Sequence, residues 1–160
     1  MTAATDHSGP PLPPVNAVTR PWWDATRERR LVLQRCETCR HWQHYPRAHC
    51  VACGSRSLAF EEASGRAVVD SFTVVHRPPY PGADVPYVVA RVRLSEGPVL
   101  LTNLVDCDID CLQCDQQVVV TWRDLRDGRA LPVFRPLSDV TAKPTQPGAN
   151  QPRAPREGTR

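Results

Sequence analysis

Two pairs of cysteines stand at a spacing that suits one bound metal ion. Cys36 and Cys39 form the first pair, ten residues intervene, and Cys50 and Cys53 form the second. Each pair can close a tight turn that offers two thiolates to a tetrahedral ion, as in a four-cysteine zinc ribbon. Gly54, directly after the second pair, suits such a turn because glycine lets the backbone bend sharply. The spacing predicts a zinc site, with iron or four free thiols as the alternatives.

Four sulfur ligands complete the coordination of a zinc ion and leave no position for water or substrate. The predicted site is therefore structural and not catalytic. Four thiolates around a divalent ion leave excess negative charge, and we expect nearby arginines to offset it locally. These arginines are Arg35, Arg40, Arg47 and Arg56. Histidines between the cysteine pairs are expected to be exposed loop residues without a ligand or acid–base role, namely His41, His44 and His49.

Three further cysteines, Cys107, Cys111 and Cys114, have the spacing with which radical-SAM enzymes hold an iron–sulfur cluster. Such an enzyme needs a large barrel that a chain of 160 residues cannot supply. Acidic residues at 106–110 imitate the start of a calcium loop, but Cys111 stands where that loop needs glycine. A solvated turn is the expected structure there. No Ser-His-Asp set, glycine-rich phosphate loop or carboxylate pair emerges from the sequence.

A stiff, proline-rich loop begins with His76 and Arg77 and continues through Tyr80. It could line a ligand or partner surface, or it could be a plain connection with a solvent-facing histidine. Trp22 and Trp23 are adjacent, so on a helix their side chains point about 100° apart. One groove inside the chain could hardly bury both, and we expect at least one of them to face a partner.

These residues need elements that position them. Thr19 as a possible cap, Pro21 and Asp24 indicate a short helix from Thr19 to about Arg29. Strands are predicted on either side of the cysteine pairs, over residues 31–35 and 58–62. Five more are predicted over residues 67–75, 87–94, 99–105, 118–122 and around 133–134. Five short strands suit a small closed barrel without exposed edges, and we predict an OB-type barrel in a mainly β protein.

Proline-rich segments at both ends define the limits of the folded part. Residues 1–18 and 138–160 are predicted to be disordered tails. The helix and ribbon then occupy residues 19–62, and the barrel occupies residues 63–137. Neither a signal-peptide pattern nor a run of about 18 apolar residues is present. A cytoplasmic protein is therefore expected, in which paired cysteines indicate a metal site and not disulfides.

The distribution of charge argues against a nucleic-acid surface on the barrel. Residues 20–56 carry eight Arg and three acids, a net charge of +5, whereas residues 57–136 carry eight Arg and eleven acids, a net charge of −3. A nucleic-acid-binding barrel needs clustered basic residues with aromatic residues on one face. Single-stranded nucleic-acid binding stays the main alternative, since OB barrels and zinc ribbons both serve it elsewhere. An independent enzyme with His76 as its base is a third possibility.

Several segments together resemble the Zn-ribbon and OB-fold proteins, a family long classed as a domain of unknown function (DUF35). They are residues 21–23, residues 30–36, the two cysteine pairs with Tyr45-Pro46-Arg47 between them, Gly65, and residues 71–79, 86–90 and 131–136. The resemblance covers about residues 20–137. Arg40 and Asp115 depart from it, because each stands near a position where the family usually has glycine. These departures concern the geometry of two turns.

The resemblance implies a rubredoxin-like ribbon and an acyl-CoA context, in lipid metabolism and steroid degradation. Members of this family look like small companions of thiolase-like enzymes, including sterol side-chain aldolases, and some are fused to acyl-CoA hydratase domains. This chain would then be a noncatalytic accessory subunit that binds and stabilises such a partner and helps form its acyl-CoA site. The residues expected to contact the partner or acyl-CoA are Trp22, Trp23, His76, Arg77 and Tyr80.

Overall fold

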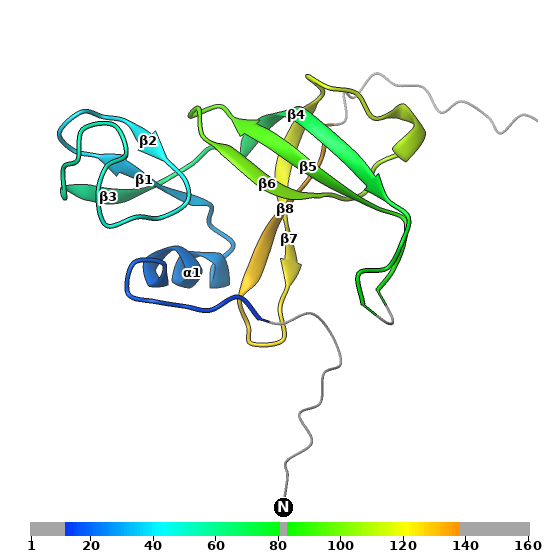
Figure 1. The fold of residues 1–160 in the computed structure, drawn as a ribbon, viewed down its shortest axis with the longest axis horizontal. Helices are drawn as coiled ribbons and strands as arrows, with labels where there is room; N and C mark the ends of the chain where they lie inside the picture. Colours follow the sequence, from blue (N-terminus) through cyan, green and yellow to red (C-terminus); the bar gives the residue numbers. More distant parts are fainter. Residues whose placement is uncertain (1–11, 81–82, 138–160) are drawn as a thin grey trace, which may run out of the picture.

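A computed structural model gives the structure of residues 12–80 and 83–137. A short helix, a three-stranded sheet and a five-stranded closed barrel follow one another along the chain (Figure 1). The predicted mainly β fold with these three parts is confirmed. The tails predicted to be disordered, residues 1–18 and 138–160, lie outside the described residues except for 12–18. Within the described part, no helix is long and apolar enough to cross a membrane.

Helix α1 spans Arg20–Arg27 and begins after a turn around Asn16. The Asn16 Oδ1 accepts hydrogen bonds from the backbone N–H groups of Val18 and Thr19, at 3.0 and 2.9 Å. Thr19 occupies the predicted cap position, but its hydroxyl makes no hydrogen bond to the helix. The Thr19 hydroxyl instead accepts the N–H of Asn16 at 3.1 Å. An asparagine turn therefore replaces a side-chain cap.

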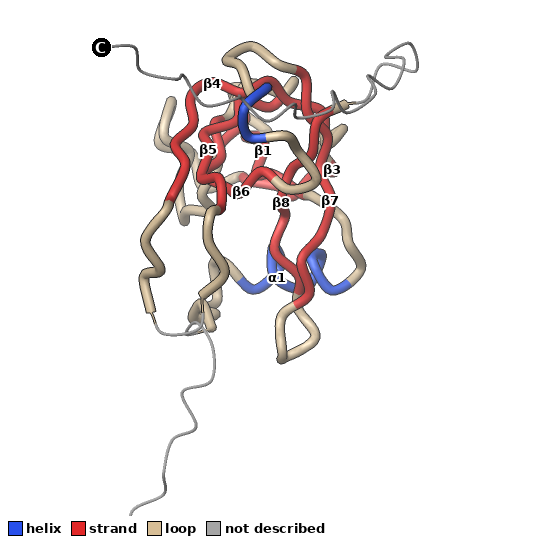
Figure 2. The backbone as a smooth tube through the Cα atoms, turned by 90° about the vertical axis from the view of Figure 1, so that its right-hand side faces the viewer, coloured by secondary structure: helices blue, strands red, loops and turns tan. Residues whose placement is uncertain are grey.

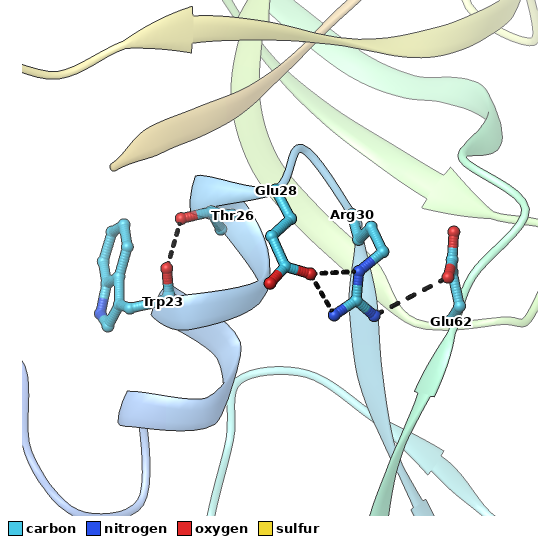
Figure 3. Close-up of polar contacts among 5 residues, drawn as sticks. All are labelled: Trp23, Thr26, Glu28, Arg30 and Glu62. Carbon is cyan, nitrogen blue, oxygen red and sulfur yellow. Dashed lines mark hydrogen bonds and ion pairs between the residues drawn. The ribbon is translucent and has the colours of Figure 1, made fainter. Parts of the chain in front are cut away.

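The end of α1 is joined to the sheet that follows. Thr26 is buried, and its hydroxyl donates to Trp23 O at 2.8 Å within the helix (Figure 3). After the helix, Arg30 lies between two carboxylates, with Nη2 2.6 Å from Glu28 Oε2 and Nη1 3.9 Å from Glu62 Oε2 (Figure 3). Exposed ion pairs of this kind stabilise a fold by less than about 1 kcal/mol each. These ion pairs orient the chain as it enters the sheet, and they add little to the stability of the fold.

The three-stranded sheet is antiparallel, in the order β2-β1-β3. Its strands are β1 Val32–Cys36, β2 Trp42–Gln43 and β3 Leu58–Glu62. The predicted strands over residues 31–35 and 58–62 match β1 and β3 to within one residue. No sequence signal predicts β2, because two residues are too few to show a periodicity. Strand β1 is central and ends at Cys36, so it leads the chain directly into the first cysteine pair.

The barrel strands lie in the spatial order β4-β5-β6-β8-β7. Their bounds are β4 Arg66–Val75, β5 Tyr87–Leu94, β6 Val99–Leu104, β7 Gln117–Asp124 and β8 Ala130–Pro136. These are the five predicted strands; β5 has the predicted ends, and the ends of the others differ by at most three residues. The alternation predicted for β5 is present, since Val88 and Val92 are buried while Arg91 and Arg93 are exposed. A short 3₁₀ helix, η1 (Ile109–Cys111), lies between β6 and β7.

Side chains on both faces of the chain around β1 are buried, and they belong to two different apolar clusters. Leu33 is 1% exposed and packs in the barrel core together with Phe134, which is fully buried. Val32 packs in a second cluster with α1, to which Phe60 and Leu131 also contribute. Because successive side chains of a strand point to opposite faces, one strand serves both clusters. Helix, ribbon and barrel are thereby packed on one another.

Trp22 and Trp23 are both buried, each 8% exposed, so the expectation that one of them would be left for a partner is wrong. The physical reason is that α1 packs between two neighbours. The Trp22 ring lies 5.8 Å from the ring of His44 in the ribbon. The Trp23 ring lies 4.3 Å from the guanidinium of Arg129 in the barrel. Side chains that point about 100° apart therefore both find partners inside the chain.

Arg129 fixes the helix to the β7–β8 hairpin. Its side chain is 4% exposed, and its Nε lies 2.6 Å from Asp127 Oδ2. Arg27 of the helix donates from Nη1 to Asp127 O at 2.9 Å. Figures 1 and 2 both show α1 beside this hairpin. A buried, paired cation stacked on Trp23 is a contact that is costly to break from either side.

Gly65 generates the first testable prediction. Its φ is +71°, and a Cβ there would lie 2.5 Å from Val120 Cγ1. Gly65→Ala should lower the free energy of unfolding by about 2–4 kcal/mol, from left-handed strain and overpacking together. Gly54→Ala is the control, since Gly54 has φ +75° but open space around it, and should cost only about 1–2 kcal/mol. Equal losses in urea unfolding would contradict this reading of Gly65.

Candidate metal centre

The two cysteine pairs form turns of the same design. After Cys36, the N–H of Arg40 donates to Cys36 O at 2.8 Å; after Cys50, the N–H of Gly54 donates to Cys50 O at 2.9 Å. Arg40 and Gly54 both adopt positive φ, at +63° and +75°. The predicted role of Gly54 is confirmed, and Arg40 takes the glycine-like conformation at a cost of about 1–2 kcal/mol. The first turn therefore keeps its geometry without glycine.

The four sulfurs of the two pairs form one compact cluster. Cys36 Sγ lies 3.6 Å from Cys53 Sγ, and Cys39 Sγ lies 3.6 Å from Cys50 Sγ. All four lie within 4.8 Å of one another. A tetrahedral ion with metal–sulfur bonds of about 2.3 Å needs its ligands ~3.8 Å apart. The described residues thus present a set of donors that fits a zinc-sized ion.

The backbone and the neighbouring thiols set the protonation of this cluster. The N–H of Cys39, 3.5 Å from Cys36 Sγ, lowers the pKa of Cys36 to about 6. The N–H of His41 lowers the pKa of Cys39, but the thiols of Cys53, Cys50 and Cys36 together with burial outweigh it and raise that pKa to about 12. These effects favour the thiolate at Cys36 and oppose it at Cys39. Full ionisation of the four sulfurs requires a bound positive ion.

The arginines expected to offset the thiolate charge have different surroundings. Arg35 does not do so, because its Nη1 lies 2.9 Å from Glu61 Oε2 and its guanidinium lies over the Trp42 ring. Arg56 donates from Nε to His49 Nε2 at 3.0 Å. Arg40, Arg47 and Arg56 are exposed and form no ion pair within the described ranges. For these three, charge compensation stays a prediction.

Two buried glutamines hold the loop between the cysteine pairs. Gln43 Nε2 donates to Gln34 Oε1 at 2.8 Å, and Gln34 Oε1 also accepts the N–H of Arg47 at 2.7 Å. Gln43 Oε1 accepts the N–H of Val51 at 3.0 Å, directly after Cys50. Gln34 and Gln43 are 5% and 4% exposed. Sequence reasoning missed this network, because nothing in the local pattern reveals that two glutamines face each other across β1 and β2.

The ribbon histidines lie outside the sulfur cluster, which contains only the four cysteines. His41 and His49 are exposed. His44 is half-buried, and burial lowers its pKa to about 4. Its neutral ring packs against Trp22 and lies 4.2 Å from the ring of Tyr45. His44 therefore joins the helix to the ribbon.

The proline-rich loop contributes to a groove of about 700 Å³ beside the β7–β8 hairpin. Tyr80 lines this groove together with Arg123 and Leu131. His76 and Arg77 are exposed and do not line it. Arg123 donates to Asn103 Oδ1 at 3.4 Å, and both residues line the groove. The sequence could not place Tyr80 near this hairpin, because the two segments are about forty residues apart in the chain.

The other cysteines are not gathered into a metal site. Within the described ranges, the only group of metal-ligating side chains is the four-cysteine cluster. Cys111 Sγ donates to Asp108 Oδ2 at 3.2 Å, and that carboxylate raises the pKa of Cys111. Burial, together with Asp106 and Asp108, raises the pKa of Cys107. The predicted solvated turn includes η1, and Asp115 after it has φ +62°.

Comparison with family models gives two matches along the described region. Residues 23–59 match the model described as "ChsH2, rubredoxin-like zinc ribbon domain". Residues 60–123 match the model described as "ChsH2, C-terminal OB-fold domain". The first match contains the sulfur cluster, and the second contains most of the barrel.

Individual relatives agree with these matches. A "DUF35 domain-containing scaffold protein" of Pyrococcus furiosus is 33% identical over 69% of this chain and 81% of that protein. A "Probable enoyl-CoA hydratase alpha subunit" of Thermomonospora curvata is 42% identical over 79% of this chain. This chain spans only 40% of that longer relative.

Solved structures show the same similarity. A chain of the "Ltp2-ChsH2(DUF35) aldolase" is 42% identical and superposes with a TM-score of 0.73, covering 78% of this chain and 98% of that one. A Sulfolobus solfataricus protein of the DUF35 family is 13% identical with a TM-score of 0.56, which shows a shared fold alone.

Substitution of one cluster cysteine tests the metal centre. Cys39→Ser should lower zinc affinity by roughly 100-fold or more, because it removes one of four thiolates that hold the ion. Metal content by mass spectrometry and competition with a chromogenic chelator would measure this. Cys114→Ser is the control, since Cys114 is exposed and lies outside the cluster. Equal zinc loss in both variants would contradict the assignment.

Proposed function

We infer that this chain, which belongs to the DUF35 family of zinc-ribbon and OB-fold proteins, is a noncatalytic accessory subunit of an enzyme that processes acyl-CoA. Its partner would be a thiolase-like protein, such as an aldolase of the lipid-transfer type, or an acyl-CoA hydratase. The chain would bind and stabilise that partner and help form its acyl-CoA site. The partner would supply the nucleophile and the acid–base groups.

The likeness to the Ltp2-ChsH2(DUF35) aldolase chain carries this proposal. That chain is covered to 98% at 42% identity, so the similarity extends over the whole folded part and not over one motif. Relatives named as hydratase alpha subunits are longer than this chain, which spans 40% and 34% of two of them. A module found both as a separate chain and within longer subunits suits an accessory role.

The metal centre supports a structural function for zinc in this subunit. Four sulfurs at tetrahedral distances complete the coordination of one ion, so no ligand position remains for a substrate. The ion would hold the two turns of the ribbon together and would neutralise part of the thiolate charge. Its chemistry is therefore that of a cross-link within the fold.

The groove beside Tyr80 is the surface we assign to the acyl-CoA site of the complex. Tyr80 and Leu131 offer apolar contact, and Arg123 offers a guanidinium of the kind that pairs with phosphate. Asp124 lies in the same wall but is already paired with Arg29, with Nη2 2.9 Å from Oδ1. His76 and Arg77 lie on the same loop, outside the groove, and are proposed to meet the partner protein.

Single-stranded nucleic-acid binding by the barrel is the alternative function. Phe72 and Trp122 are partly buried against the barrel core, which leaves little of their rings for stacking on bases. Of the exposed barrel arginines, Arg91 and Arg93 already share the carboxylate of Asp70. A flat titration with a labelled single-stranded oligonucleotide at low salt would remove this alternative.

Complex formation is the first test of the proposed function. Co-expression with a thiolase-like aldolase or an acyl-CoA hydratase should give a mixed complex that contains one zinc ion per copy of this chain, because the ribbon binds its ion within the subunit. Native mass spectrometry measures both the stoichiometry and the metal. If the zinc-loaded chain stayed unbound in the presence of every such candidate, that result would count against the accessory role.

Tyr80→Ala tests the acyl-CoA surface once the complex is in hand. Loss of the aromatic face should raise the KM of the complex for acyl-CoA by about 3- to 10-fold, which corresponds to about 0.5–1.5 kcal/mol. The complex itself should still form. Val85→Ala is the matched control, because Val85 is 38% exposed on the same loop but does not line the groove. An unchanged KM for Tyr80→Ala would remove Tyr80 from the site.

A further inference from the structure

The segment before α1 contributes to the groove beside the β7–β8 hairpin. We call residues 12–19 the N-terminal arm; in Figure 1 the arm runs in dark blue below α1 toward that hairpin. Leu12 lines the groove and is half-buried, whereas Val15, further along the arm, is 41% exposed and does not line it. The groove of about 700 Å³ lies within the ~300–1,000 Å³ range of small-ligand sites. The arm is therefore part of a cavity large enough for a ligand.

Backbone constraints hold the arm in this direction. The carbonyl oxygen of Asn16 accepts the N–H of Arg20 at 2.9 Å, so a closed turn joins the arm to the start of α1. Pro13 and Pro14 stand between Leu12 and that turn. Their rings fix φ, and a residue that precedes a proline is restricted to extended backbone. The arm is therefore a stiff extension of the helix that presents Leu12 to the groove.

Neither apolar cluster of the fold depends on Leu12. Among the described residues, the clusters in the barrel and around the helix include neither Leu12 nor Tyr80, whereas Leu131 packs against the helix cluster. Apolar side chains that line a groove without belonging to a core keep surface available for a ligand. Substitution of Leu12 should therefore change what the groove binds without changing the fold.

Three segments that are far apart in the sequence bring different chemical groups to the groove. The arm contributes Leu12, the loop after β4 contributes Tyr80 and Asp84, and β7 contributes Arg123. Neither Asp84 nor Arg123 forms an ion pair within residues 12–80 and 83–137. The Arg123 guanidinium donates to the neutral amide of Asn103 at 3.4 Å. The groove thus offers an aliphatic side chain, an aromatic ring, a carboxylate and a cation.

These four groups match the nucleotide end of coenzyme A. Adenine has apolar faces on which an aromatic ring stacks, and its amino group donates a hydrogen bond that a carboxylate accepts. The ribose carries phosphate, which a guanidinium binds with charge-assisted hydrogen bonds. An acyl chain in the same groove would cover Asp84 and Arg123 without pairing either of them, which is costly. The groove therefore suits the nucleotide better than the acyl group.

We propose that this groove takes the nucleotide end of acyl-CoA and that the N-terminal arm is part of that site. Leu12 and Tyr80 contact the adenine ring. Asp84 accepts a hydrogen bond from the adenine amino group, and Arg123 pairs with a phosphate. This inference rests on the proposed function, because it names the part of acyl-CoA that the groove binds in the complex. The thioester end extends from the groove into the partner, which supplies the catalytic groups.

Titration of the zinc-loaded complex with adenosine 3′,5′-bisphosphate, which carries the adenine ring and ribose phosphates of CoA, tests the role of the arm. Leu12→Asp removes an apolar contact and adds a negative charge near the phosphates, so the dissociation constant should rise about tenfold or more. Val15→Asp is the matched control, because Val15 lies on the same arm but outside the groove. Both variants should keep the zinc content and the unfolding midpoint of the unaltered chain.

Two outcomes of this titration would overturn the inference. Equal dissociation constants for Leu12→Asp and Val15→Asp would remove the arm from the site. Absence of binding by the unaltered complex would remove the nucleotide from the groove.

Michaelis constants for two substrates separate this inference from the proposed function. Acyl-CoA and the matching acyl-pantetheine differ in the nucleotide end. Leu12→Asp should raise KM for acyl-CoA about tenfold and leave KM for acyl-pantetheine within about twofold of its value in the unaltered complex. Equal changes for both substrates would overturn the inference, and the proposed acyl-CoA surface would stand if Tyr80→Ala still raised KM for acyl-CoA. If neither variant changed KM for acyl-CoA, the groove would not be the acyl-CoA surface and both proposals would fail.

Discussion

The burial of the chain on both sides of β1 ties the metal centre to the rest of the molecule. Leu33 packs into the barrel core and Val32 packs into the cluster around the helix. Cys36, at the end of the same strand, is one of the four cysteines of the sulfur cluster. Gln34, between them, bonds to the loop that leads to the second cysteine pair. Displacement of this strand would disturb the two apolar clusters, the amide network and the metal site together.

Electrostatics sets a second constraint, because four sulfurs within 4.8 Å cannot all ionise without a cation. Cys36 ionises readily while its neighbours oppose ionisation of Cys39. A bound ion would therefore complete a structure that the backbone turns and the glutamine pair have already arranged. In a chain whose ribbon has only two short strands beside β1, such a cross-link would replace the apolar core that a domain of this size cannot build.

Much of this arrangement follows from local sequence, and the rest depends on contacts between distant segments. Paired cysteines with tight turns give the cluster, and alternating residues such as those of β5 give the barrel strands, because both signals repeat within a few residues. The burial of Trp22 and Trp23 was not predictable, since it requires knowing that α1 has a neighbour on each side. Tyr80 and Arg123 line one groove only because the barrel topology brings their segments together.

The two adjacent tryptophans also limit how the length of this chain can vary. Trp22 meets His44 of the ribbon and Trp23 meets Arg129 of the barrel, so the rotation of α1 about its axis is fixed from two sides. One residue inserted or deleted between Trp23 and β1 would turn the helix by about 100° and direct at least one of the two tryptophans away from its present contact. Substitutions can be accommodated one contact at a time, but a change of length cannot. The length of the stretch from Pro21 to β1 should therefore be fixed.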